Sequence, residues 1–306
     1  MPPLTILDKI KNLQLQSGGF PSHHGELERP DATAWALIVL ASSQADSTAY
    51  DKGSAYLASL QGSDGRICID RNSSTASWPT ALAIMAWNHS LKFQQNRESS
   101  VQFLLEFSGQ HFPKPENSII GHDPSILGWP WIADTHSWVI PTGMAMIALQ
   151  IAGVGQHTRV DQGADMLIDR QLPHGGWNYG NTLAFGKTLH PLPECTGVAL
   201  QALSTKIPRS RIDRSLDYLL QQPPLLRTPI SLAWTILGLS AWGLKPDDTN
   251  TLISDSLNLQ KRYGTYSLPS LALLYCASHA PQGLHSLFHT SHSQQSMVGS
   301  LAAPRS

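Results

Sequence analysis

Two carboxylates hold the same place relative to a threonine in distant parts of the chain. Asp31 and Glu194 each lie two residues before a threonine, Thr33 and Thr196, and each directly follows a proline. At the start of a helix, such a carboxylate can serve simply as a cap or as a charge that the helix dipole favours. In a dry, apolar pocket it can instead keep its proton and act as an acid. The residue types alone therefore allow either a capping or an acidic role for Asp31 and Glu194.

Aromatic side chains are the second feature that could do chemistry. The chain has nine tryptophans, and several fall in a long central loop or near the starts of apolar segments. Aromatic faces attract a developing cation and exclude water, although rings at helical spacing can equally fill a core. The residues that we expect to contact a ligand are Trp78, Trp138, His136 and Tyr179.

Histidine and cysteine offer a further kind of site. Several of the thirteen histidines lie in loops, and Cys195 lies beside Glu194. One cysteine without partners at a fixed spacing is a weak indication of zinc, and the sequence has no phosphate-binding or dinucleotide-binding motif. We therefore expect neither a metal nor a cofactor. Three scattered cysteines also indicate a reducing compartment without a disulfide framework.

A repeated pattern positions these residues. A segment with apolar residues three or four apart runs into a glutamine, then into a glycine–aromatic turn and a loop. A second segment, rich in Thr, Ala and Leu, follows each loop. We expect about six such copies, each a helical hairpin. The second helices should begin near Ala32, Thr80, Thr142, Thr196, Ser231 and Ser270.

The hairpins determine the fold that we expect. A single hairpin cannot bury its apolar stripe, so neighbouring hairpins must stack. Six of them can close into a ring, with the second helices inside and the first helices outside. The pattern predicts an all-α fold, an (α/α)6 toroid, with residues 1–280 as a single domain. Residues 281–306 show no period and are expected to form a disordered tail.

The fourth copy of the pattern resembles a motif of a known family. Gly163–Trp177, GADMLIDRQLPHGGW, is similar to the Gln–Trp repeat of squalene and oxidosqualene cyclases. Its signature positions are Gln171, Gly175 and Trp177. Degraded copies lie at Gln16/Gly18/Phe20 and at Gln61/Gly65. The chain thus resembles the prenyltransferase/squalene-cyclase repeat superfamily, in which the Gln and Trp of this motif are structural.

The resemblance also implies a place for an acid. In these cyclases the residue two before the threonine protonates the substrate, and Asp31 and Glu194 take that position here. Two departures accompany the match. Arg29 and Ala32 replace the flanking carboxylates of the D-x-D-D-T-A motif, and full-length cyclases use two such domains. The resemblance implies a terpene-cyclase-like enzyme that cyclises an isoprenoid chain by protonation, with Asp31 as the preferred acid and Glu194 as the second candidate.

Three other functions fit the same sequence. A non-catalytic toroid would bind an apolar ligand or a partner protein. A protein-prenyltransferase-like subunit would need zinc and a partner subunit. A sugar-active barrel would use Asp31 and Glu194 as paired carboxylates. An apolar pocket with one buried carboxylate favours the cyclase, an open polar groove with two favours the sugar-active enzyme, and a filled core favours the binding protein.

The composition limits the partners. Hydrophobic residues make up 41% and charged residues 14% of the 306 residues, and the formal net charge is -1. Without a cluster of Lys and Arg, a nucleic-acid partner is not expected. The sequence shows no signal peptide and no apolar run of about 18 residues, which predicts a cytoplasmic protein. Contact with a membrane surface, and a second subunit that completes the site, stay open.

Overall fold

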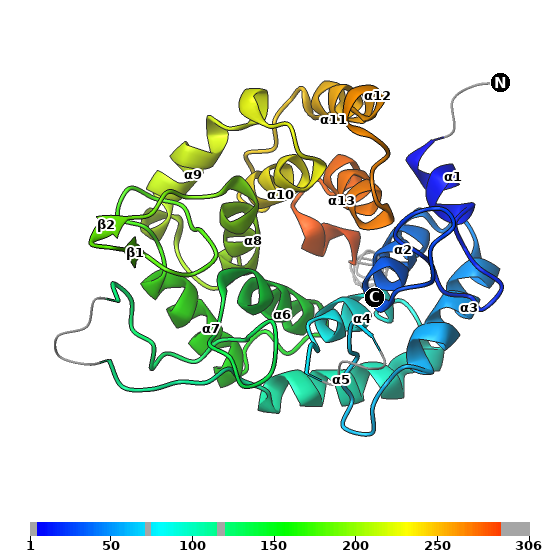
Figure 1. The fold of residues 1–306 in the computed structure, drawn as a ribbon, viewed down its shortest axis with the longest axis horizontal. Coiled ribbons are helices and arrows are strands. Elements are labelled where there is room, and N and C mark those ends of the chain that lie inside the picture. Colours follow the sequence, from blue (N-terminus) through cyan, green and yellow to red (C-terminus); the bar gives the residue numbers. More distant parts are fainter. Residues whose placement is uncertain (1–4, 71–74, 115–119, 289–306) are drawn as a thin grey trace, which may run out of the picture.

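The computed structural model describes residues 5–70, 75–114 and 120–288, which fold almost entirely into helices. Within this part of the chain, six helical hairpins follow one another around a ring (Figure 1). One helix of each hairpin lies inside the ring and the other lies outside. The all-α toroid expected from the repeats is therefore confirmed.

The second helices of the hairpins form the inner ring, as predicted. Each contacts the next one along the chain, and the last contacts the first, which closes the ring. The inner helices are α2 (Pro30–Ser43), α4 (Pro79–Ala86), α6 (Val139–Ile151), α8 (Pro193–Leu203), α10 (Pro229–Ser240) and α13 (Leu268–His279).

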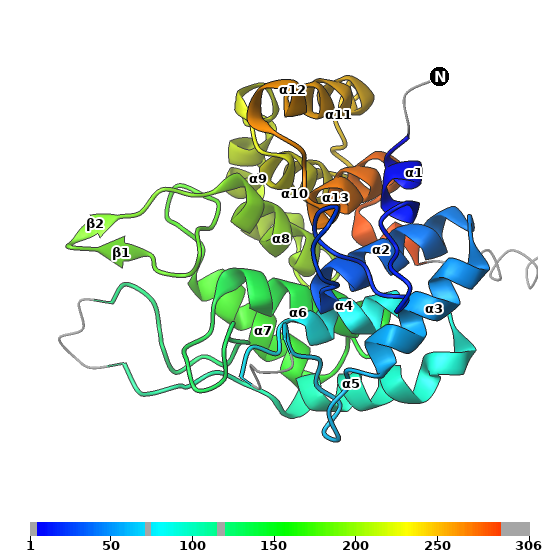
Figure 2. The same ribbon diagram turned by 45° about the vertical axis from the view of Figure 1, so that its right-hand side comes forward.

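The first helices of the hairpins form the outer layer. They are α1 (Ile6–Lys11), α3 (Ser47–Ala58), α5 (Gln94–Glu106), α7 (Thr158–Asp169), α9 (Asp213–Leu220) and α11 (Thr249–Asn258), the last extended by α12 (Gln260–Tyr263). Short 3-10 helices occur at η1 (Leu91–Phe93), η2 (Arg209–Arg211), η3 (Pro223–Leu225) and η4 (Leu284–Leu287). A two-stranded antiparallel hairpin, β1 (Leu183–Ala184) and β2 (Lys187–Thr188), projects from the body before α8 (Figure 2).

The two layers differ in burial because of their places in the ring. Every residue of α4 is buried, and so is every residue of α8 from Cys195 to Leu203. Outer helices such as α9 bury only one stripe, which in α9 comprises Ser215, Leu216 and Leu219. Helices that are apolar on all sides belong inside, whereas amphipathic ones belong at the surface. The composition of each segment therefore decides its layer.

Four threonines near the starts of inner helices fix the turns that precede them. The hydroxyl of each accepts a hydrogen bond of 2.9–3.0 Å from a backbone N–H group of a turn. The threonines are Thr33, Thr80, Thr142 and Thr196, and the N–H donors are Phe20, Ile67, Trp129 and Trp177. All four threonines are fully buried. The threonine of the repeat is thus a structural residue that holds the loop against the inner helix.

The glutamine of the repeat is also structural, but one copy was assigned to the wrong residue. Gln61 and Gln171 each lie four residues before a glycine with positive φ, and each donates to a backbone carbonyl of the next outer segment. In the first copy Gln14, not Gln16, does this, since it donates to Gly18 O and Ala49 O. The spacing of four to the glycine identifies the equivalent residue, and the first copy was read two residues too late.

Residues 281–288 are packed against the ring, which corrects the expectation of a disordered tail for this segment. Leu284 and Phe288 are buried, and the N–H group of Leu284 donates to Gln201 Oε1 at 2.7 Å. His285 contacts the side chains of Gln150 and Gln201 at 2.9 and 2.7 Å. The segment therefore covers the C-terminal ends of α6 and α8. Residues 289–306 lie outside the described part of the chain.

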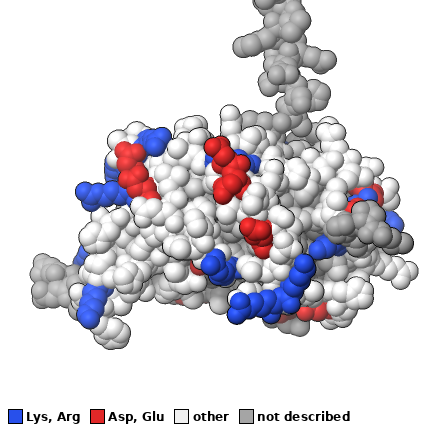
Figure 3. Space-filling model, turned by 90° about the horizontal axis from the view of Figure 1, so that it is seen from above, with Lys and Arg blue, Asp and Glu red and all other residues white. Residues whose placement is uncertain are grey.

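Charges are sparse on the face of the molecule that Figure 3 shows, where basic and acidic side chains lie interspersed among uncharged ones. None of the described helices is long and apolar enough to cross a membrane.

Candidate functional site

A cavity opens in the centre of the ring, at the N-terminal ends of the inner helices. Its volume is about 240 Å³, and 19 of the described residues line it. Asp31 is the only charged residue among them, and Ser77 is the only other with a hydroxyl or carboxyl group. The cavity is thus an apolar pocket with one carboxylate in its wall.

The lining follows the repeat. At the starts of five of the six inner helices, two residues four positions apart line the cavity. The first residue of each pair is the equivalent of Asp31 in its copy of the repeat. Residues four apart lie on one face of a helix, so each inner helix presents the same face to the centre. The pairs are Asp31/Trp35, Trp78/Leu82, Ile140/Met144, Ile230/Trp234 and Pro269/Leu273. In α8 the equivalent pair, Glu194 and Val198, does not contribute to the lining.

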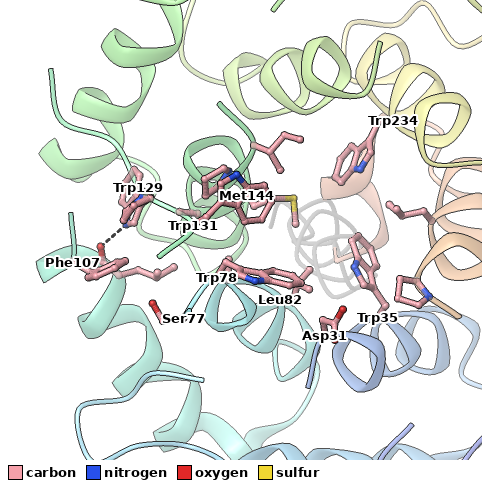
Figure 4. A pocket seen from close by; sticks show the side chains of 18 of the residues that line it. Asp31, Trp35, Ser77, Trp78, Leu82, Phe107, Trp129, Trp131, Met144 and Trp234 are labelled. Atoms are coloured by element: carbon pink, nitrogen blue, oxygen red, sulfur yellow. Dashed lines mark hydrogen bonds between the residues drawn. The ribbon is translucent and has the colours of Figure 1, made fainter. Parts of the chain in front are cut away.

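Tryptophans form most of the aromatic wall. Trp35 and Trp234 meet edge to face with ring centroids 6.4 Å apart, and Trp78 meets Trp131 in the same way at 5.7 Å. Figure 4 shows the first pair on one side of the cavity and the second pair, with Met144, on the other. Trp129 is fixed by a 2.9 Å hydrogen bond from Nε1 to the carbonyl of Leu104. Edge-to-face rings held in this way make a rigid wall.

Asp31 lies in the first turn of α2 and points its carboxylate toward the cavity (Figure 4). Arg29 donates to both of its oxygens, from Nε to Oδ1 at 3.0 Å and from Nη2 to Oδ2 at 3.1 Å. Such a bidentate pair binds the anion of the carboxyl group. The hydrogen bond to Asp31 in turn raises the pKa of Arg29. Asp31 is not the N-cap of α2, because Arg29 holds that position without a side-chain cap bond.

Glu194 lies in the first turn of α8, outside the cavity lining. Its Oε2 accepts a 2.7 Å hydrogen bond from Ser231 Oγ on the neighbouring helix α10. The helices α2 and α8 are opposite one another in the ring, three neighbours apart in either direction (Figure 1). The structure therefore does not bring Asp31 and Glu194 together.

The four expected ligand contacts fall into different places. Trp78 lines the central cavity. His136 is exposed and belongs to a second, smaller pocket, and Trp138 packs against it with ring centroids 4.2 Å apart. Tyr179 is 52% exposed. Neither Trp138 nor His136 nor Tyr179 is part of the cavity lining, because these residues lie in loops whose path the helical period does not determine.

Cysteine and histidine do not assemble a metal centre in the described residues. No three side chains of His, Cys, Asp or Glu lie close enough together there to hold a metal ion. Cys195 is fully buried inside α8, and burial raises the pKa of its thiol. A protonated thiol is a poor metal ligand. A zinc role for Cys195 therefore has no support in the geometry.

Several lining residues were not among the candidates. Trp35 follows Asp31 by one helical turn, and Trp234 occupies the matching position of α10. Aligning the fifth copy on the first would have found Trp234, since both helices begin with a proline five residues earlier. The pairing of Arg29 with Asp31 could also have been predicted, because Arg29 stands two residues before Asp31 and carries the opposite charge.

Comparison with known proteins gives structural neighbours only. No protein-family model and no curated protein sequence matches the chain. An inactive variant of the alpha-1,6-mannanase GH76A from Salegentibacter sp., in complex with alpha-1,6-mannotriose, aligns with a TM-score of 0.59 and 13% identity over 93% of this chain and 98% of that chain. A variant of type II terpene cyclase MstE from Scytonema, in complex with geranylgeranyl dihydroxybenzoate, gives 0.52 and 14% over 92% and 80%. An alpha-amylase from Clostridium perfringens gives 0.54 and 9% over 94% and 97%.

At these identities the similarity shows the α/α toroid fold and nothing finer. The neighbours include proteins named for sugar substrates and one named for terpene cyclisation, with similar TM-scores. The fold alone therefore does not choose between these functions. The choice between these functions therefore depends on the residues that line the cavity.

Proposed function

We propose that the central cavity binds a short isoprenoid chain and that Asp31 starts an acid-dependent cyclisation of it. The observation that carries the proposal is the lining, in which five tryptophans and one carboxylate stand among otherwise nearly apolar residues. Each buried CH₂ group of such a ligand would contribute about 0.8 kcal/mol. The hydroxyl groups of a sugar would instead lose their hydrogen bonds to water without replacement, which is costly.

The size of the cavity points to a small ligand. Its volume of about 240 Å³ lies between the roughly 150 Å³ of a cavity that holds benzene and the roughly 300 Å³ at which drug-sized sites begin. Geraniol fits this range, and a longer chain such as farnesol would extend toward the mouth. A short isoprenoid is therefore the first ligand to test.

The proposed reaction is an isomerisation. Asp31, in its acid form, gives its proton to one carbon of a terminal double bond. The two π electrons form the new C–H bond, and the other carbon becomes a cation. A second double bond of the same chain attacks this cation and closes a ring. The final cation returns a proton to the carboxylate or to water, so the product is an isomer of the substrate.

Arg29 controls whether Asp31 can act as an acid. The guanidinium of Arg29 binds both oxygens of the carboxyl group, so it has to move away before Asp31 can reach a ligand. The side chain of Arg29 is 46% exposed and precedes the helix, so it can turn into solvent when a ligand enters. Within this proposal Arg29 is a positioning residue that holds the carboxyl group of Asp31 while the site is empty.

A sugar-active function is the second candidate, because the mannanase aligns over almost its whole length. Glycosidases place their two carboxyl groups about 5–9.5 Å apart. Neighbouring helix axes lie about 8–10 Å apart, so opposite axes in a ring of six lie about 16–20 Å apart. Asp31 and Glu194 stand on such opposite helices, and Ser231 holds Glu194 toward α10. The geometry therefore favours the isoprenoid ligand.

Binding is tested by titration with geraniol, farnesol and alpha-1,6-mannotriose while tryptophan fluorescence is recorded, since five of the nine tryptophans line the cavity. Met144 offers a matched pair of variants. Met144→Trp fills the cavity and should weaken geraniol binding at least about tenfold, or about 1.4 kcal/mol. Met144→Ala enlarges the cavity. It should leave the affinity for geraniol unchanged and strengthen the binding of farnesol. Tighter binding of mannotriose than of geraniol would instead support the sugar-active function.

Catalysis is tested separately, by gas chromatography and mass spectrometry of products after incubation with the ligand that binds. The expected product is a cyclic isomer of that ligand. Asp31→Asn should form none while it still binds the ligand. If the wild-type protein binds the ligand and forms no cyclic product, the catalytic half of the proposal fails and an isoprenoid-binding toroid remains.

A further inference from the structure

A second pocket lies beside the ring and shares no lining residue with the central cavity. Its volume is about 130 Å³. It is formed by residues 110–112, 120–124 and 136–137, which lie between α5 and α6, by the residue that follows α7, and by a residue before β1. We call it the Arg170 pocket, and its polar lining comprises Gln110, His111, His122, His136, Ser137, Arg170 and Asn181. Unlike the central cavity, it is rich in hydrogen-bond donors.

Two of its side chains carry a buried nitrogen atom without a hydrogen-bond partner. Arg170 is 3% exposed, and its Nη1 donates to Gly180 O at 2.8 Å while its Nε has no hydrogen-bond partner. His122 is 6% exposed, and its Nδ1 has none either. An unpartnered buried polar group costs about 1–3 kcal/mol. Buried donors that line a pocket are therefore explained best by a group that accepts from them.

The charge of Arg170 is countered by two carboxylates, those of Asp169 and Asp123. Asp169 Oδ2 lies 3.4 Å from Nε of Arg170, but it also accepts a 2.8 Å hydrogen bond from the N–H group of Asp123. Burial, and then the charge of Arg170, lower the pKa of His122 to about 4. His122 is therefore neutral near pH 7 and can donate one hydrogen bond. His136 has its pKa lowered by the same two causes.

We propose that the Arg170 pocket binds a small oxyanion, a phosphate or carboxylate group, with Arg170 and His122 as its donors. A planar guanidinium matches the two oxygens of either group. Since a water molecule takes about 30 Å³, the pocket volume of about 130 Å³ corresponds to only a few water molecules. The pocket therefore holds one phosphate or carboxylate group and little more. A metal ion does not fit the description, because no three metal-ligating side chains gather in the described residues. The site is independent of the proposed isoprenoid chemistry.

The test follows the imidazole signals of protein labelled with ¹⁵N-histidine by NMR. Inorganic phosphate and acetate are titrated separately, and each replaces chloride so that the ionic strength stays constant. Either anion should shift the signals of His122 and His136 to saturation and leave the signal of the exposed His24 unchanged. The anion that saturates at the lower concentration identifies whether the ligand carries a phosphate or a carboxylate.

Two variants separate the site from the fold. Arg170→Met should weaken binding at least about tenfold, which corresponds to about 1.4 kcal/mol. Because Arg170 also bonds Gly180, this variant can fail to fold, and His122→Asn then carries the test with a weaker but measurable loss. His24→Asn is the control and should bind as the wild type does. The proposal is overturned if no signal saturates, if His24 shifts with the others, or if a folded Arg170 or His122 variant keeps full affinity.

Discussion

Removing the charge of Asp31 separates its structural role from its proposed catalytic role. Asp31→Asn keeps the shape of the side chain but loses the ion pair with Arg29. Exposed ion pairs contribute up to about 1 kcal/mol, whereas removing one partner of a buried pair costs about 3–5 kcal/mol. The side chain of Asp31 is 9% exposed and that of Arg29 is 46% exposed. We therefore expect an intermediate loss of about 1–2 kcal/mol in the free energy of unfolding.

The chain contains a matched control for this variant. Asp64 and Arg66 form an ion pair with the same spacing of two residues, but their side chains are 40% and 38% exposed. Asp64→Asn should cost less than about 1 kcal/mol. Urea denaturation followed by circular dichroism measures both losses. Arg29→Met and the double variant complete a cycle, from which we expect a coupling of about 1 kcal/mol between Arg29 and Asp31.

The same variants then report on chemistry. If Asp31 is the acid, Asp31→Asn abolishes product formation, whereas Arg29→Met leaves both oxygens of the carboxyl group free for the ligand and keeps or raises turnover. A purely structural pair would lose stability in both variants without this contrast in turnover. If Asp31→Asn costs no more than Asp64→Asn, the buried pair does not form in solution and the reasoning about Asp31 is refuted.

Two further predictions concern the fold. Gly65→Ala forces a side chain into a left-handed backbone (φ +89°) and against the carbonyl of the next outer helix, whereas Gly25→Ala meets only the backbone strain (φ +86°). Urea denaturation should show a loss larger for Gly65→Ala by at least about 1 kcal/mol, and equal losses would contradict the packing. Burial raises the pKa of the Cys276 thiol to about 12 and that of Cys195 as well. Burial also raises the pKa of Cys68, but this thiol is only half-buried. Iodoacetamide at pH 8 should therefore modify Cys68 before the other two in the folded protein, as mass spectrometry can show, and earlier modification of either buried thiol would speak against the fold.

The ring could be predicted because each part of the repeat has a physical role that the residue types indicate. Apolar residues on all sides of the second helices place them inside, and the threonine at their starts bonds the preceding turn, as in Thr142 and Trp129. The error in the first copy came from a local ambiguity. Gln14 and Gln16 stand two residues apart, and only the spacing to the glycine distinguishes them.

The site was predicted only where it follows the helical period. Asp31 and Trp78 line the cavity because the repeat fixes their register on inner helices. Glu194 has the same register, but no residue of α8 lines the cavity, and Glu194 accepts a hydrogen bond from Ser231 of the neighbouring helix. The sequence does not indicate this contact between helices. His136 and Tyr179 lie in loops, whose paths depend on contacts far along the chain. The second pocket was missed for the same reason.

The most direct test of the central proposal is a crystal structure of the protein grown with geraniol. Density for the ligand should lie in the central cavity, between the pair Trp35 and Trp234 and the pair Trp78 and Trp131, with one end near Asp31. This position would place a double bond where the carboxyl group can reach it. An empty cavity in a crystal saturated with geraniol, or density only at the outer surface, would contradict the proposal that this cavity binds an isoprenoid.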